Sequence, residues 1–111
     1  MNPDIKTKWV AALRSGQYKQ IGGELCNETG FCCLGVLCEI SKEETGFGIT
    51  ENRAERVAAS ETLSKTIIAW SGLPAWYGAM VTIDSVKHAL INHNDDGRTF
   101  LEIADAIEAQ L

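Results

Sequence analysis

The sequence predicts an α+β fold: one mostly helical domain over residues 1–111, with four or five helices and a short two- or three-stranded antiparallel sheet. The length predicts a single domain, and 45% hydrophobic with 23% charged residues is typical of a soluble globule. Apolar residues recur at helical spacing in several segments that are bounded by capping residues and glycines. Residues 17–33 instead hold short apolar pieces around a glycine pair, and such pieces suit strands.

The first helix is expected over residues 3–15. Asn2 can cap it, and Pro3 suits the first helical position, where a backbone N–H has no helical partner. Gly16 is a suitable residue just past its end. The apolar residues that share one face of this helix are Ile5, Trp9, Ala12 and Leu13.

The glycine pair Gly22 and Gly23 separates two candidate strands, around 18–21 and 24–27, either of which could pair with 30–33. A cysteine-rich run from Phe31 to Cys38 follows. It opens a second helix, whose apolar face is formed by Cys33, Val36, Leu37 and Ile40. Gly35 lowers helix stability by about 1 kcal/mol relative to alanine. A neighbouring backbone or a ligand could approach closely there, although we favour a plain packing reason.

Two further helices are expected before the last one. Ser60 is a candidate N-cap for a helix that ends at Gly72. Thr82 or Asp84 is expected to cap a helix that contains Val86, Ala89 and Leu90.

The last helix begins with a capping box, with Thr99 at the N-cap and Glu102 three residues later. The preceding stretch Asn92–Gly97 partly resembles a calcium-binding loop. The final position of such a loop requires a bidentate glutamate, and Ile103 stands there instead. The capping box therefore explains Glu102 better than a calcium site does.

The four cysteines allow three interpretations. A zinc site fits poorly, because the spacing lacks ligand pairs two to four residues apart and because adjacent Cys32 and Cys33 point in different directions. Disulfides are not expected in a reducing cytosol, and the N-terminus lacks the apolar segment of a signal peptide. We favour free, buried thiols that pack as small hydrophobic residues, and we expect no bound metal or other cofactor.

The net charge of −5 argues against non-specific binding to nucleic acid, which requires an excess of lysine and arginine. No apolar stretch approaches the roughly 20 residues that span a bilayer. Together with the absence of a signal peptide, this predicts a cytoplasmic protein that does not engage membranes.

Candidate ligand-binding residues are aromatic or basic. Lys19 belongs to a local basic excess, with Lys6, Lys8 and Arg14, that could contact an anionic ligand. Aromatic side chains combine a large apolar face with a polar tip and so can line a pocket, although core packing is their commoner role. The residues that we select are Tyr18, Lys19, Trp70, Trp76 and Tyr77.

Catalytic motifs such as GxSxG, HExxH and CxxC are absent from the sequence. A cysteine–histidine pair stays open, because such partners meet in space and not along the chain. The candidates for it are Cys32, Cys33 and Cys38 with His88 or His93.

Three pieces of the chain resemble a group of small proteins of tailed phages and prophages: residues 8–16 with 18–20, the run Phe31 to Cys38, and residues 94–104. Glu39 stands where that group usually has aspartate. The resemblance implies a phage-encoded accessory protein that acts in the host cytoplasm, and it implies no particular activity. We therefore expect a non-enzymatic protein that antagonises a host defence or regulatory component.

Such antagonism could act in two ways: the protein could cover a host protein, or it could sequester a small anionic ligand such as a nucleotide signal. The alternative is a small cysteine-dependent enzyme or a metal-stabilised module. A homodimer stays open, because small binding proteins often dimerise. The sequence shows no exposed apolar stripe that would favour one.

Overall fold

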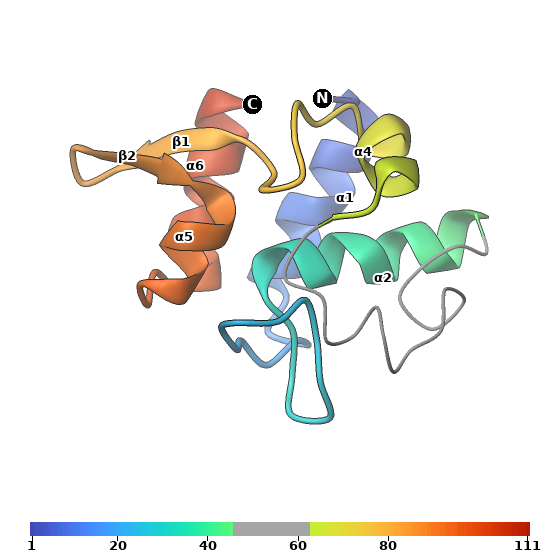
Figure 1. The fold of residues 1–111 in the computed structure, drawn as a ribbon, viewed down its shortest axis with the longest axis horizontal. Helices are drawn as coiled ribbons and strands as arrows, with labels where there is room; N and C mark the ends of the chain where they lie inside the picture. Colours follow the sequence, from blue (N-terminus) through green and yellow to red (C-terminus); the bar gives the residue numbers. More distant parts are fainter. Residues whose placement is uncertain (46–62) are drawn as a thin grey trace.

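The computed structural model describes residues 1–45 and 63–111 (Figure 1). Within them the elements are α1 (Pro3–Arg14), α2 (Cys33–Thr45), α4 (Lys65–Ser71), β1 (Met80–Ile83), β2 (Val86–Ala89), α5 (Leu90–Asp95) and α6 (Phe100–Gln110). The two strands pair antiparallel. The predicted α+β class, mostly helical with a short antiparallel sheet, is confirmed.

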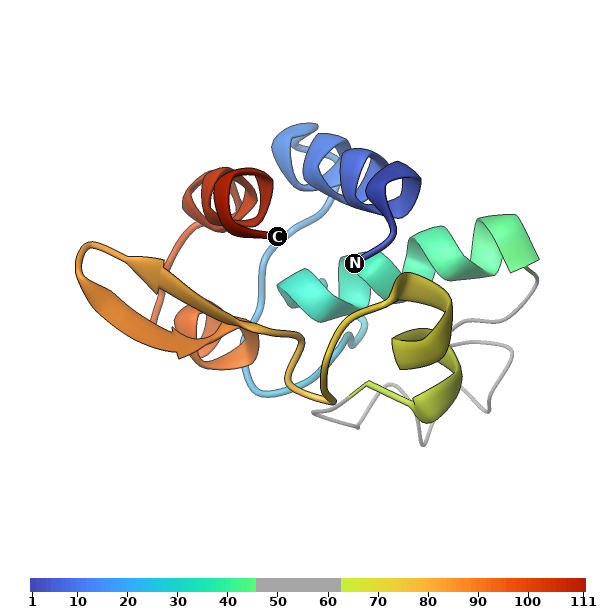
Figure 2. The ribbon, with the colours of Figure 1, turned by 90° about the horizontal axis from the view of Figure 1, so that it is seen from above.

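Helices α1 and α6 lie side by side and form the most extensively packed pair of elements (Figure 2). Helix α2 runs across α1, and the β1–β2 hairpin and α5 pack against α6 (Figures 1 and 2). Helix α5 also contacts α2, so it links the hairpin side of the molecule to the cysteine-rich helix. One hydrophobic core joins all these elements.

The start of α2 is the centre of this core. Every residue from Cys32 to Cys38 is buried, so the helix is enclosed on all sides and not only along one stripe. Trp9 of α1 is fully buried against it, and its indole N–H donates to the Cys33 carbonyl oxygen at 2.9 Å. A side chain at Gly35 would meet the Leu25 carbonyl oxygen, because a Cβ built there lies 1.8 Å from it. The close approach there is therefore that of a neighbouring backbone.

Both predicted terminal helices are confirmed, together with their caps. The Asn2 side chain accepts hydrogen bonds from the backbone N–H groups of Asp4 and Ile5 at the start of α1. At α6 the capping box is complete: the Thr99 hydroxyl accepts from the Glu102 N–H, and the Glu102 carboxylate accepts from the Thr99 N–H.

Residues 80–89 form a hairpin where the sequence predicts a helix capped by Thr82 or Asp84, so that prediction is wrong. Along β1 exposed and buried residues alternate, with Val81 and Ile83 inside, which is the period of a strand. The hairpin turns at Asp84 and Ser85, whose φ angles of 51° and 69° are those of a type I′ turn. Helix begins only at Leu90.

The predicted sheet is thus real but lies elsewhere in the chain. Residues 17–33 form only isolated bridges, between Gln20 and Phe31 and between Cys26 and Phe31. Backbone hydrogen bonds within the segment hold it together, and the side chain of Asn94, which is buried at the end of α5, joins it to the rest of the molecule. The Asn94 carboxamide oxygen accepts from the Cys33 N–H at 3.1 Å and from the Gln20 side chain at 2.9 Å. Its nitrogen donates to the Ile21 carbonyl oxygen at 2.6 Å.

Helix α4 begins at Lys65, with the Ser64 side chain as its N-cap. The predicted cap at Ser60 lies outside the described residues. The predicted end of this helix is confirmed, since Gly72 is its C-cap in the left-handed conformation, with φ +75°.

Candidate functional site

The selected residues fall into two groups that lie apart. Tyr18 and Lys19 belong to the segment between α1 and α2, whereas Trp70 lies on α4 and Trp76 and Tyr77 lie between α4 and β1. Figure 1 shows the first segment at the bottom of the molecule, and α4 and the chain that follows it toward the top. One pocket formed by all five residues is therefore excluded.

The first group lies in acidic surroundings. The Tyr18 ring contacts the Phe31 ring edge-on, with 5.2 Å between their centroids. Burial, together with the nearby Glu43 and Glu39 carboxylates, raises the pKa of Tyr18 above its ordinary value. An anionic ligand at Tyr18 would meet the same two carboxylates, so the electrostatics there oppose it.

The second group contains an aromatic turn, which we define as Ala75–Gly78. The Gly78 N–H donates to the Ala75 carbonyl oxygen at 3.0 Å, which places Trp76 and Tyr77 at the two corners of the turn. Their rings meet edge-on with centroids 5.2 Å apart. Trp76 is 53% exposed, and its indole N–H has no hydrogen-bond partner in the part of the chain that the structure describes.

The aromatic turn is fixed to the rest of the molecule at two points. The Leu63 N–H donates to the Trp76 carbonyl oxygen at 3.0 Å. Gly78 packs so closely on the core that a Cβ there would lie 3.0 Å from side-chain atoms of Leu34 and Leu90. An exposed tryptophan is thus presented on a backbone that is held in place.

The thiols have the properties of packing residues. Burial raises the pKa of Cys32 to about 11 and that of Cys38 to about 12, and it raises the pKa of Cys33 well above the ordinary value. Cys26 is partly buried, and burial followed by the Glu39 carboxylate raises its pKa too. All four are free. Since the thiolate is the reactive form, these surroundings suppress nucleophilic and metal-ligating chemistry.

The histidines are committed to structural contacts. His93 is buried and its Nε2 lies 2.8 Å from the Val81 carbonyl oxygen, so this nitrogen carries the proton and donates. His88 Nδ1 lies 3.3 Å from the Asn92 side-chain nitrogen, and its ring meets that of His93 edge-on. Within residues 1–45 and 63–111, no group of three or more histidine, cysteine, aspartate or glutamate side chains could hold a metal ion.

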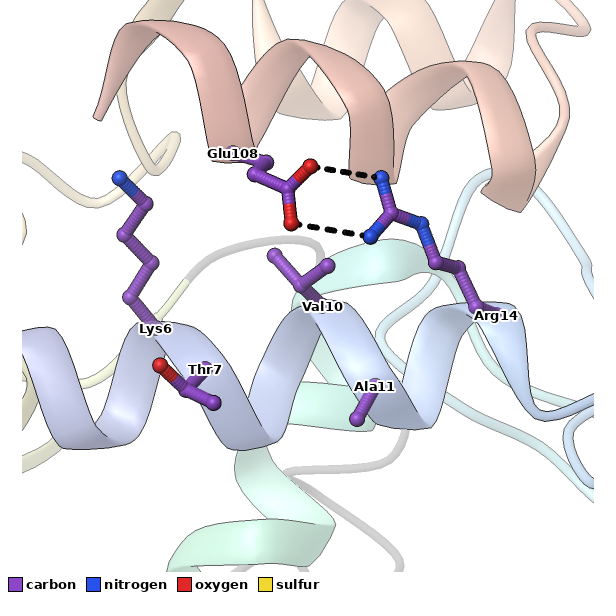
Figure 3. Close-up of a pocket in the computed structure, with 6 residues that line it drawn as sticks. All are labelled: Lys6, Thr7, Val10, Ala11, Arg14 and Glu108. Atoms are coloured by element: carbon purple, nitrogen blue, oxygen red, sulfur yellow. Dashed lines mark hydrogen bonds and ion pairs between the residues drawn. The ribbon is translucent and has the colours of Figure 1, made fainter.

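A pocket of about 350 Å³ lies between α1 and α6. Figure 3 shows Lys6, Val10 and Arg14 along α1, with Glu108 reaching across from α6 to Arg14. The Arg14 guanidinium donates to both Glu108 carboxylate oxygens, at 3.0 and 3.2 Å, and to Asp105 at 2.7 Å. Both terminal nitrogens of the guanidinium are therefore already bonded to the protein's own carboxylates, and an incoming anion would have to compete with them.

Two of the four basic residues in the predicted basic cluster form ion pairs with carboxylates. Lys8 pairs with Glu44 on α2, and Arg14 pairs with Glu108 and Asp105. Lys6 and Lys19 have no ion pair among the residues that the structure describes. The basic residues of α1 thus serve mainly to join α1 to its neighbouring helices.

A second pocket, of about 320 Å³, lies on the other side of α6, against β1. Its walls include Asp84, Glu102, Asp105 and Gln110. Sequence analysis missed it, because it requires β1 to be a strand and places Gln110 beside Thr82. The acidic character of α6, which has three carboxylates and no basic residue, is the one signal that the sequence offers.

None of the helices in the described part of the chain has the length and apolar character that a bilayer crossing needs. No curated protein and no solved structure matches the chain. A family model described as a domain of unknown function, DUF8296, matches residues 1–111, and the chain therefore belongs to this family.

Proposed function

We propose that this chain is a phage-encoded, non-enzymatic accessory protein that binds a host protein in the host cytoplasm and antagonises a defence or regulatory component. The observation that carries the proposal is the exposure of Trp76 on the aromatic turn. The phage origin is supported by the resemblance of residues 8–20, 31–38 and 94–104 to small phage proteins.

Trp76 has the properties of an interface anchor. Tryptophan is enriched among residues that dominate binding energy, because it combines a large apolar face with one N–H donor. Trp76 is more than half exposed, and its indole N–H makes no hydrogen bond in the described part of the chain. Because the turn is already held by Leu63 and Gly78, binding would lose little conformational entropy.

Charge favours a protein partner over a small anion. Glu39 and Glu43 lie near Tyr18, and both terminal nitrogens of Arg14 are already bonded to Glu108 or Asp105. A nucleotide-like ligand would have to displace these carboxylates or be repelled by them. A protein partner requires neither, because it can contact the aromatic turn alone.

The test is capture of host proteins on immobilised wild-type protein, with two variants in parallel. Trp76→Ala removes the proposed anchor, and Leu101→Ala removes another exposed apolar side chain, 59% exposed, from α6. A partner retained by wild type and Leu101→Ala but recovered at least about tenfold less by Trp76→Ala supports the proposal.

Equal recovery of the partner by both variants would show that the aromatic turn is not the contact. Native mass spectrometry of protein purified from the host tests the alternative, which is that the chain sequesters a small anionic ligand. An added mass of nucleotide size, with no protein captured, would replace the host-protein partner by a small ligand.

A further inference from the structure

The outer edge of β1 is covered by a side chain and not by a strand. Ile83 and Val86 flank the two-residue turn and form a hydrogen-bonded pair of the hairpin. Hydrogen-bonded and non-hydrogen-bonded pairs alternate along an antiparallel ladder, so the next pair, Thr82 with Lys87, is not hydrogen-bonded. The N–H and C=O groups of Thr82 therefore face away from β2. There the Gln110 side chain accepts from the Thr82 N–H at 2.8 Å and donates to the Thr82 carbonyl oxygen at 2.8 Å. A primary amide thereby makes the two hydrogen bonds that a residue of an adjacent strand would make.

This covering is weak enough to be exchanged. Gln110 is exposed in the last turn of α6, and Thr82 is exposed as well. Each hydrogen bond at such an exposed site adds little net stability, because water competes for the same groups. An extended peptide that pairs with β1 would replace both bonds and extend the sheet by one strand. By the same alternation, the peptide groups of Met80 face this edge and lengthen it.

The groove beside this edge is acidic. Asp84, Glu102 and Asp105 line it, and Arg98 is the basic residue paired with the first two. The Asp84 and Asp105 side chains are 71% and 74% exposed, so both carboxylates stay accessible despite their ion pairs. A strand in this groove would place alternate side chains toward α6, within reach of these carboxylates.

We infer that the groove between β1 and α6 binds an extended, basic segment of another protein, which displaces the Gln110 amide and adds a strand to β1. Its main chain pairs with Thr82, and its lysine or arginine side chains meet Asp84, Glu102 and Asp105. This surface is separate from the aromatic turn, and the inference holds whether or not Trp76 anchors a partner.

The charge of the groove also decides against a second copy of this chain as the occupant. Two copies that met edge to edge along β1 would bring their own Asp84, Glu102 and Asp105 carboxylates together. Like charges across such an interface oppose association, whereas a basic segment neutralises them.

The test uses synthetic hexapeptides and isothermal titration calorimetry with the full chain. The probe alternates lysine and valine. One control peptide alternates glutamate and valine, and another carries methyl groups on alternate backbone nitrogens of the lysine peptide. We expect the unmethylated lysine peptide to bind and neither control peptide to bind. Binding should shift the signal of the Thr82 amide in the NMR spectrum. Equal binding of the methylated peptide would overturn the strand pairing.

Three variants distinguish binding in this groove from non-specific attraction of a basic peptide to an acidic protein. Gln110→Ala should tighten binding about fivefold, because the peptide no longer competes with the amide. Asp105→Asn should weaken it about threefold. Glu28→Gln, which changes the net charge equally at an exposed turn, should leave it unchanged.

Equal weakening by Asp105→Asn and Glu28→Gln, or no effect of Gln110→Ala, would overturn the proposal. Dimerisation of Gln110→Ala in sedimentation experiments without peptide binding would overturn it as well and would identify a second copy as the occupant. Circular dichroism of each variant establishes that it is folded.

Discussion

Gly35 shows how a single residue can be fixed by its surroundings rather than by its own helix propensity. It lies inside α2, where alanine would favour the helix by about 1 kcal/mol. The Leu25 carbonyl oxygen occupies the place of a Cβ, and this same oxygen accepts the Cys32 N–H at 2.9 Å. Neither backbone can move without breaking this contact between α2 and the preceding segment.

We therefore expect Gly35→Ala to lower the free energy of unfolding by about 3 kcal/mol, in spite of the gain in helix propensity. Urea denaturation followed by circular dichroism measures it. Ala11→Gly, at an exposed position of α1, is the matched control and should cost only about 1 kcal/mol. A Gly35→Ala variant as stable as wild type would show that the two backbones separate easily.

At the scale of the element, α6 depends on its cap at one end and on ion pairs along its sides. The Thr99 N–H, followed by the Thr99 hydroxyl and Arg98, lowers the pKa of Glu102 below its ordinary value near 4.5. Because the folded state favours the ionised form, Glu102 contributes stability above its ordinary pKa. That contribution is lost as the pH falls through the lowered value.

Glu102→Gln should accordingly destabilise the protein at neutral pH, and the difference from wild type should shrink as the pH falls below 4.5. Denaturation curves at several pH values measure this. Glu28→Gln, at an exposed turn, serves as the control for the loss of one carboxylate. A difference for Glu102→Gln that stays constant with pH would mean that hydrogen bonding, and not charge, stabilises the cap.

At the scale of the whole molecule, the buried cysteines report on global unfolding. Cys32, Cys33 and Cys38 lie in the core, whereas Cys26 lies partly exposed between α1 and α2. Alkylation of the native protein should modify Cys26 first and leave the other three protected, and all four should react in concentrated urea. Mass spectrometry of the alkylated protein identifies the sites.

Fast alkylation of any of the three core thiols in the native state would contradict this picture. It would show an accessible thiolate and would revive the alternative of a cysteine-dependent enzyme. The same experiment thus bears on both the packing of α2 and the proposed absence of catalysis.

Local chemistry made several features predictable. Asn2 with Pro3, and Thr99 with Glu102, fix where α1 and α6 begin, because a cap acts within three or four residues. The apolar run from Phe31 to Cys38 predicted a buried helix with free thiols, and three of the four cysteines are fully buried. The sequence offered Trp76 as a candidate binding residue, but its exposure could not be inferred, since the same residue type serves in cores and on surfaces.

The hairpin was missed for a physical reason. A type I′ turn favours glycine as its second residue, as in Asn-Gly or Asp-Gly, but here Ser85 follows Asp84, so the turn signal between the strands is weak. Asp84 is held there by Arg98, fourteen residues later in the chain. The prediction of a sheet within residues 17–33 is wrong in its place, because this segment pairs only at isolated bridges, and the Asn94 side chain on α5 bonds the Ile21 carbonyl oxygen and the Cys33 N–H instead.

By itself, the sequence determined the α+β class and the capped ends of α1 and α6, because apolar spacing and helix caps act within a few residues. Only the tertiary structure decided which residues form the sheet, that Arg14 donates hydrogen bonds to carboxylates of α6, and that Gln110 covers the edge of β1. The Gln110 and Arg14 contacts join residues 28 and 94 positions apart, and no local pattern specifies which distant side chain will satisfy a given backbone group or charge.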